Sequence, residues 1–152
     1  MKYVLIILAL LGVIVSSLAL REHYREYGDS PCSINERWDC GVVNHSPFAV
    51  LGGVFEQMGL PRIPLLSALP VATAGILGYI LLAALISFRR YRLLLGFTLF
   101  SLAFSLYLAH IEKDVLGVWC IYCVISLGII SLMTLLTLGT VIVQLTRKPS
   151  PA

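Results

Sequence analysis

Charged side chains are scarce in this sequence. Only 12% of its 152 residues are charged and 59% are hydrophobic, and the mean hydropathy is +0.92. Soluble domains carry about 25% charged residues. The composition therefore excludes a water-soluble globular protein and predicts one integral membrane domain over residues 1–152. No nucleic-acid-binding signature is present, so we expect no nucleic-acid partner. Internal repeats and low-complexity segments are also lacking.

Uncharged runs predict four transmembrane helices, since a helix needs about 20 apolar residues to cross a bilayer. The predicted spans cover about residues 3–20, 65–88, 93–110 and 117–144. In the second span, Pro70 lies near the start, where a missing N–H costs least. Gly75 and Gly78 are candidate positions for close helix packing. The expected fold is an all-α, four-helix membrane bundle.

The first run also fits a second interpretation. Ser17-Leu18-Ala19 has small residues at the spacing of a signal-peptide cleavage site. The apolar run is longer than a usual signal-peptide core, so we expect an uncleaved span. Under either interpretation, the segment that follows emerges on the outer side of the membrane.

Residues 21–64 form the long polar stretch of the chain and carry six of the eight acidic residues. We predict that they form an extramembrane loop, with turn chemistry at 28–31 and a short helical turn at 33–37. Apolar residues recur at helical spacing over 46–58 and predict a short interfacial helix that caps the bundle. An ordinary amphipathic surface helix fits the same pattern.

The placement of Lys and Arg predicts the orientation. Lys2, the cluster at 89–92 and the pair at 147–148 alternate to one side of the predicted spans, and all acidic residues alternate to the other. Because Lys and Arg near span ends are retained in the cytoplasm, we expect both termini to be cytoplasmic. The loop and all cysteines then face the periplasm or its equivalent; the family resemblance given below implies a bacterial inner membrane.

Two of the four cysteines lie three residues apart at the head of the last uncharged run. Cys120 and Cys123 share a helix face and are close enough for a disulfide between adjacent turns. At a helix N-terminus, backbone N–H groups favour the reactive thiolate. This pair is a candidate dithiol/disulfide switch, although buried cysteines also occur as small hydrophobic residues in apolar helices.

Cys32 and Cys40 form a second pair on the same predicted side. Two static disulfides are one interpretation of the four cysteines. A four-thiolate zinc site is disfavoured by an oxidising compartment and a membrane-embedded half, so we expect no metal. The third interpretation is a relay, in which the loop pair passes electrons to the membrane pair. A membrane location for the second pair makes sense if the final acceptor is a lipid-soluble quinone.

The order of these residues resembles a known family. Cys32 and Cys40 are separated by seven residues and followed by Asn44-His45-Ser46-Pro47-Phe48, and Trp119-Cys120-Ile121-Tyr122-Cys123 opens the last span. This pattern is similar, over essentially the whole chain, to the bacterial form of the vitamin K epoxide reductase family. The resemblance implies a four-helix bundle around a quinone, with Cys123 nearest the ring. It also implies that Cys120 exchanges with Cys40 and that Cys32 meets the protein substrate.

The implied function is oxidation of a periplasmic thioredoxin-like (DsbA-like) protein and reduction of ubiquinone or menaquinone, in support of disulfide bond formation. Many bacterial members carry a thioredoxin-like domain after the last span. None follows here, so we expect a stand-alone homologue with a separate partner. The animal-type reductase of vitamin K epoxide is an alternative, but Leu127 stands where the animal enzymes have an aromatic hydroxyl. A non-catalytic protein with two structural disulfides is the other alternative.

Several residues near the predicted outer ends are candidate quinone contacts. Ser46 matches the family's loop hydroxyl position, although it also suits a helix N-cap before Pro47. Aromatic residues at span ends commonly anchor at the membrane interface instead. The full set of candidates is Cys123, Ser46, Phe48, Tyr107, His110, Trp119 and Tyr122.

Overall fold

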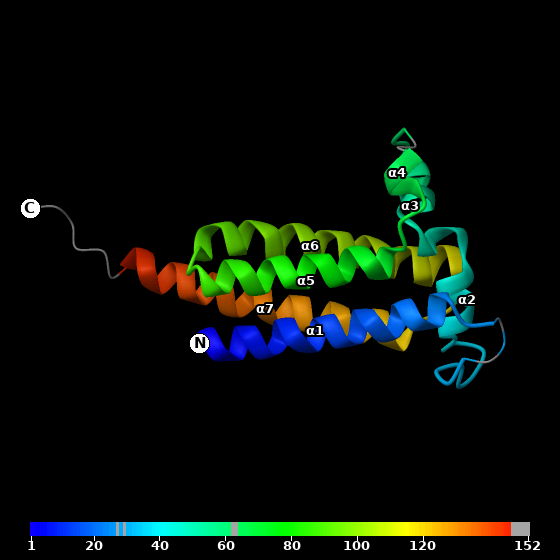
Figure 1. The fold of residues 1–152 in the computed structure, drawn as a ribbon, viewed down its shortest axis with the longest axis horizontal. Helices are drawn as coiled ribbons and strands as arrows, with labels where there is room; N and C mark the ends of the chain where they lie inside the picture. Colours follow the sequence, from blue (N-terminus) through cyan, green and yellow to red (C-terminus); the bar gives the residue numbers. More distant parts are fainter. Residues whose placement is uncertain (27, 29, 62–63, 147–152) are drawn as a thin grey trace, which may run out of the picture.

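The computed structural model describes residues 1–26, 28, 30–61 and 64–146, and these contain helices and no β-strand. The elements in chain order are α1 (Lys2–His23), α2 (Cys40–His45), the 3-10 turn η1 (Pro47–Ala49), α3 (Leu51–Gln57), α4 (Pro64–Ser67), α5 (Val71–Ser87), α6 (Tyr91–Ile111), the π-helical turn η2 (Glu112–Leu116) and α7 (Ile121–Thr146). The long helices α1, α5, α6 and α7 lie side by side (Figure 1). The start of α1 and the end of α7 lie at one end of this bundle, and α2, α3 and α4 lie at the other.

Three helical stretches are long and apolar enough to cross a membrane: Lys2–His23, Tyr91–Leu116 and Ile121–Thr146. The fourth long helix, α5, is apolar but has 17 residues. The all-helical membrane class that the composition predicts is therefore supported by the fold.

The predicted second span at 65–88 is wrong in its first turn and a half. The structure has a separate helix α4 at Pro64–Ser67, and α5 begins only at Val71. The cause is Pro70, which disfavours the helical conformation in the preceding residue. Leu69 instead accepts a backbone hydrogen bond from the N–H of Leu51 at 2.9 Å. This contact ties the start of α3 to the start of α5.

The other predicted boundaries shift for local reasons. Helix α1 continues past residue 20 because Arg21 and Glu22 end the apolar run without ending the helix. The connection between the predicted spans at 93–110 and 117–144 is helical, since α6 continues through Ile111 into η2. Gly117 ends η2 in the left-handed conformation, with φ of +68°, which glycine adopts without strain. Residues 118–120 are then non-helical, so α7 begins at Ile121 rather than at 117.

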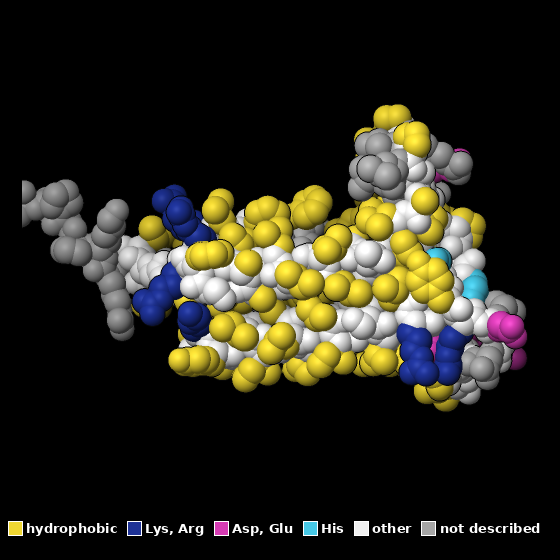
Figure 2. Space-filling view, in the orientation of Figure 1, with side chains coloured by type: hydrophobic (Ala, Val, Ile, Leu, Met, Phe, Trp, Pro, Cys, Tyr) yellow, Lys and Arg dark blue, Asp and Glu magenta, His cyan; other side chains and the backbone are white. Residues whose placement is uncertain are grey.

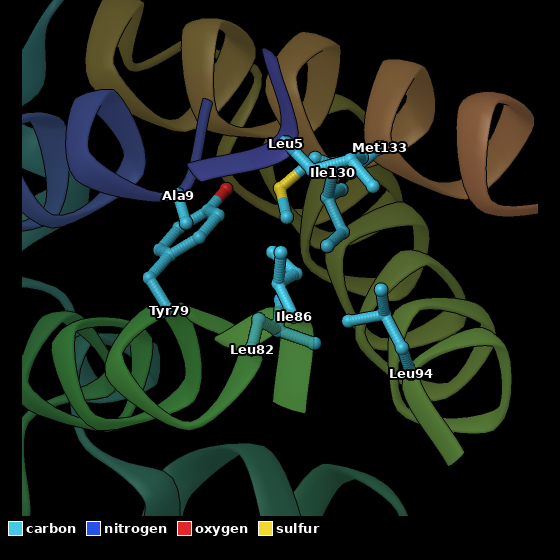
Figure 3. Close-up of a cluster of buried hydrophobic side chains, with 8 residues drawn as sticks. All are labelled: Leu5, Ala9, Tyr79, Leu82, Ile86, Leu94, Ile130 and Met133. Carbon is cyan, nitrogen blue, oxygen red and sulfur yellow. The ribbon is translucent and has the colours of Figure 1, made fainter. Parts of the chain in front are cut away.

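Close packing between α1 and α5 holds the bundle together. A Cβ on Gly12 would overlap the ring of Tyr79, and one on Gly75 would lie 2.9 Å from Ser16 Oγ. Gly75 is thus a close-packing position as predicted, whereas a Cβ on Gly78 would meet none of the described residues of the neighbouring elements within 4 Å. The buried cluster around these helices draws on α1, α5, α6 and α7 and consists of Leu5, Ala9, Tyr79, Leu82, Ile86, Leu94, Ile130 and Met133 (Figure 3).

The segment before α5 contains shorter elements than the sequence predicts. Residues 33–37 do not form a helical turn, because Asn35 and Trp38 pair across a two-residue turn. The single helix expected at 46–58 is divided into η1 and α3 by Val50, which is extended and pairs with Pro70. Helices α3 and α4 project sideways from the end of the bundle (Figure 1).

Acidic side chains are confined to one end of the bundle in the view of Figure 2. Lys and Arg side chains lie at both ends, whereas Asp and Glu side chains appear only at the end opposite the N-terminus. Hydrophobic side chains cover much of the surface between them. Arg89 adopts a left-handed conformation in the turn between α5 and α6. Arg147 and Lys148, which the predicted orientation also used, lie outside the described residues.

Candidate redox site

The loop cysteines Cys32 and Cys40 form a disulfide, with their Cα atoms 5.7 Å apart. Cys40 is the first residue of α2 and is fully buried, whereas Cys32 retains 7% exposure. Both cysteines of the bridge are therefore buried, and Cys32 is the less deeply buried of the two.

Asp39 fixes the start of α2, next to Cys40. Its Oδ1 accepts hydrogen bonds from the backbone N–H of Val42 at 3.1 Å and from the hydroxyl of Ser33 at 2.6 Å. The Ser33 hydrogen bond is the largest influence and lowers the pKa of Asp39. The Val42 and Gly41 N–H groups act in the same direction, against the opposing effect of partial burial. An ionised Asp39 is thus a helix cap that also ties the loop turn to α2.

A short backbone ladder docks the loop onto the segment before α7. The N–H of Trp119 donates to the carbonyl of Arg37 at 2.8 Å, and the N–H of Asp39 donates to the carbonyl of Trp119 at 3.1 Å. The rings of Trp38 and Trp119 pack with their centroids 6.4 Å apart. Because the ladder pairs 38 with 119 in parallel, it brings the following residues of the two segments together.

The two cysteine pairs consequently meet in one buried cluster. Cys32, Cys40, Val43 and Cys120 form its centre, and Cys123 packs against it. Asn44 lies between the pairs, since its Nδ2 donates to the carbonyl of Cys40 at 2.9 Å and to Cys120 Sγ at 3.7 Å. An amide donor at this position stabilises a thiolate on Cys120.

Cys120 and Cys123 are separate thiols that differ in their surroundings. Cys120 is fully buried and immediately precedes α7, and its carbonyl accepts a hydrogen bond from Val124 N–H at 3.0 Å. Cys123 lies in the first turn of α7 and lines a cavity of about 590 Å³, whereas Cys120 does not. The pair therefore connects the loop disulfide on one side with the cavity on the other.

The cavity has the size and lining of a site for a small apolar ring compound. Ligand pockets usually measure about 300–1,000 Å³ and combine apolar walls with a few polar groups. Here Phe97, Phe100 and Phe104 of α6 supply aromatic surface, and residues of α3 and α5 supply aliphatic surface. The few polar groups include Ser46 and Glu112. This donor set fits a quinone, for which the walls would bind the ring and tail.

The structure brings four of the seven predicted quinone contacts to the cavity. These are Cys123, Ser46, Phe48 and Tyr122. Ser46 does not cap η1, since its hydroxyl donates back to the carbonyl of Val43 at 2.8 Å.

The other three predicted contacts do not line the cavity. The residues of α6 and the start of η2 that line the cavity recur at helical spacing, at positions 101, 104, 105, 108, 111 and 112. Tyr107 and His110 lie on another face of the helix. His110 pairs instead with Asp114 at 2.7 Å, and both side chains are exposed. Trp119 packs on Trp38. These corrections follow from helix phase and from the ladder.

Glu112 is a residue of the site that sequence reasoning missed. It is 3% exposed, lines the cavity, and accepts the N–H of Cys120 at 3.0 Å through Oε2. The sequence prediction left it in the connection between the span that ends at 110 and the span that begins at 117. The four-residue spacing from Phe104 through Leu108 to Glu112 was the available signal for a cavity-facing position.

A second buried acid, Glu22 at the end of α1, anchors the loop. Its Oε2 accepts the hydroxyl of Ser30 at 2.7 Å, and its Oε1 lies 3.7 Å from Arg25. The Ser30 hydroxyl also approaches Cys32 Sγ at 3.9 Å. This carboxylate therefore positions the loop around the outer cysteine.

An apolar helical bundle with a disulfide docked against a second pair of thiols defines a membrane thiol–disulfide protein. The chain belongs to the vitamin K epoxide reductase family, whose family model matches residues 3–138. No curated protein sequence matches the chain significantly. Family membership implies an oxidoreductase that works in a membrane on thiols and disulfides, and members of this family generally use quinones.

Proposed function

We propose that this protein oxidises a periplasmic thioredoxin-like protein of the DsbA type and passes the two electrons to a membrane quinone, in support of disulfide bond formation. The observation that carries the proposal is the ladder between Trp38 and Trp119. It docks the loop pair, Cys32 and Cys40, against Cys120, while Cys123 faces an apolar cavity.

The relay consists of two thiol–disulfide exchanges followed by a redox step. A thiolate of the partner attacks Cys32 Sγ, and resolution by its second thiol releases the partner as a disulfide and leaves Cys32 and Cys40 reduced. When Cys120 and Cys123 are in their oxidised form, joined by a disulfide, the Cys40 thiolate attacks Cys120 Sγ, and the Cys120–Cys123 bond breaks with its electron pair leaving on Cys123 Sγ. Cys32 closes the loop disulfide again and releases Cys120. A quinone, when bound in the cavity, supplies the acceptor for two electrons and two protons.

The same proposal includes a four-span topology in a bacterial inner membrane. Helix α5 rises about 26 Å over its 17 residues at 1.5 Å each, close to the hydrocarbon thickness of about 30 Å. The Lys and Arg side chains at the N-terminal end of the bundle support cytoplasmic termini (Figure 2). Ubiquinone and menaquinone both fit an apolar cavity, and a vitamin K-type quinone is a further candidate.

Leu127 bears on the alternative of an animal-type epoxide reductase. It packs against the buried core cluster and does not line the cavity. Position 127 therefore supplies no hydroxyl to a ligand in the cavity. This observation favours thiol oxidation over epoxide reduction.

The decisive experiment compares two electron donors in purified protein with added quinone. Single replacement of Cys32 or Cys40 by Ala should stop oxidation of the protein donor, because a folded donor cannot reach a fully buried Cys120. Dithiothreitol is small enough to reach Cys120, so it should still reduce the quinone. Cys123→Ser should abolish turnover with both donors.

Matched controls separate the relay from a structural staple. Glu36→Gln changes an exposed loop residue without touching a sulfur and should retain turnover with both donors. If Cys32→Ala/Cys40→Ala oxidised its protein donor at near wild-type rate, the loop disulfide would be a staple and the relay would be abandoned.

A further inference from the structure

Glu112 is a buried acid within reach of both thiols of the membrane pair. It lies where α6 passes into η2, and its carboxyl group lines the cavity together with Cys123. Among the described residues, no Lys, Arg or His side chain forms an ion pair with Glu112. Burial without a cation favours the protonated, neutral form of a carboxyl group.

The backbone holds this carboxyl group in place. The carbonyl of Glu112 accepts the N–H of Val118 at 3.2 Å, and its Oε2 accepts the N–H of Cys120 at 3.0 Å. The Glu112 side chain also lies close to the side chain of Cys123, with which it lines the cavity. Gly117 provides the reversal that brings the segment before α7 back onto η2. The carboxyl group is therefore held at the backbone of Cys120 and near the side chain of Cys123.

The chemistry of the membrane pair requires a proton donor at this point. When Cys120 Sγ is attacked, the Cys120–Cys123 bond breaks and its electron pair leaves on Cys123 Sγ. A thiolate in an apolar site carries a large desolvation cost. Asn44 also lies near the pair, but its amide donates to Cys120 rather than to Cys123. Tyr122 lies next to Cys123 in the chain and lines the same cavity.

We propose that Glu112 is the general acid of the membrane cysteine pair, a step that rests on the proposed function. As the S–S bond breaks, the carboxyl O–H of Glu112 gives its proton to Cys123 Sγ, which forms an S–H bond and leaves a carboxylate. When the dithiol is later oxidised, the carboxylate takes this proton back from Cys123. This return leaves Glu112 protonated for the next reduction of the pair.

Glu112 could instead act only as a backbone clamp or as a fixed negative charge. The three roles predict different rates of disulfide reduction for one substitution, Glu112→Gln. Glu112→Gln keeps an oxygen that can accept the N–H of Cys120, but it has no proton to transfer. If Glu112 only clamps the backbone, this variant should react at the wild-type rate. If Glu112 acts as a fixed negative charge, its removal should stabilise the leaving thiolate and speed the reaction. Loss of a general acid should slow it.

The test uses the isolated half-reaction, without quinone. Full-length protein carrying Cys32→Ala/Cys40→Ala is freed of quinone in detergent, oxidised at Cys120 and Cys123, and mixed with dithiothreitol. Samples are quenched with acid, and free thiols are counted by mass-tagged maleimide. Glu112→Gln should slow reduction at least about tenfold, since general acid–base groups contribute about 10²–10⁴-fold. Asp114→Asn, an exposed acid in the same connection, should react at the parent rate.

Each outcome decides the proposal. A Glu112→Gln rate equal to or above the parent rate would overturn the general-acid role and leave the relay intact. If the parent disulfide itself resisted dithiothreitol, the proposed function would fail instead. Should Glu112→Gln fail to fold, the parent protein is compared in H₂O and D₂O. A slower reaction in D₂O supports proton transfer in the rate-limiting step, and equal rates exclude it.

Discussion

Replacement of Asp39 should weaken docking of the loop onto the segment before α7. Asp39→Ala removes the cap of α2 and the acceptor for the Ser33 hydroxyl. An N-cap contributes about 1 kcal/mol, and a hydrogen bond about 1 kcal/mol. The loss of about 2 kcal/mol corresponds to an about 30-fold shift in the docking equilibrium. Asp39→Asn keeps a strong capping side chain and should lose much less.

Hydrogen exchange at the ladder measures this equilibrium directly. The Trp119 N–H is bonded to the carbonyl of Arg37 and exchanges when the ladder opens. Its protection factor in purified protein should fall about 30-fold in Asp39→Ala, while amides in the middle of α7 keep their protection. Unchanged protection of the Trp119 amide, or equal losses in Asp39→Ala and Asp39→Asn, would refute the capping role.

The remaining predictions concern pH, packing and the corrected residues. Folding lowers the pKa of Asp39. The stabilisation that ionised Asp39 gives the fold is therefore fully present above the ordinary carboxyl pKa and is lost as pH falls through the lowered pKa. Hydrogen-exchange protection of the Trp119 amide, corrected for intrinsic exchange, should decrease over the same pH range. Gly12→Ala should destabilise the protein by about 1–3 kcal/mol in thermal unfolding, since its Cβ overlaps Tyr79, whereas Gly78→Ala should not. His110→Ala should leave quinone reduction unchanged, because His110 does not line the cavity; a large loss of activity would contradict this assignment.

The helical class and the cysteine pairs were predictable because each follows from a local signal. Long uncharged runs indicate membrane helices without any tertiary information, and they locate three of the long helices to within a few residues. Pro70 was correctly recognised near a helix start, but its effect on Leu69 was underestimated. A proline limits its predecessor as well as itself, and here it separates α4 from α5.

The missed parts of the site depend on contacts between distant segments. The ladder joins Arg37 and Asp39 to Trp119, and neither segment has the alternating pattern of a strand. The rotation of α6 about its axis turns Glu112 toward the cavity and His110 away from it. A list of polar residues near a helix end does not reveal which of them face the cavity. Charge at 110–114 indicated solvent, although only one face of the helical turn is exposed.

The burial of the outer cysteine sets a condition on the protein donor. Cys32 retains 7% exposure, and Ser30 and Glu22 hold the loop beside it. Exchange requires an attacking sulfur to approach the disulfide directly, so a folded donor must displace part of this loop before it reacts. The fully buried Cys40 needs no such movement to reach Cys120, because the ladder already docks the two segments. Under the proposed function, the loop around Cys32 would select the donor, and the ladder would set the transfer between the pairs. Loosening the Ser30–Glu22 contact should increase the reactivity of Cys32 toward a protein donor and leave dithiothreitol-driven reduction of the membrane pair unaffected.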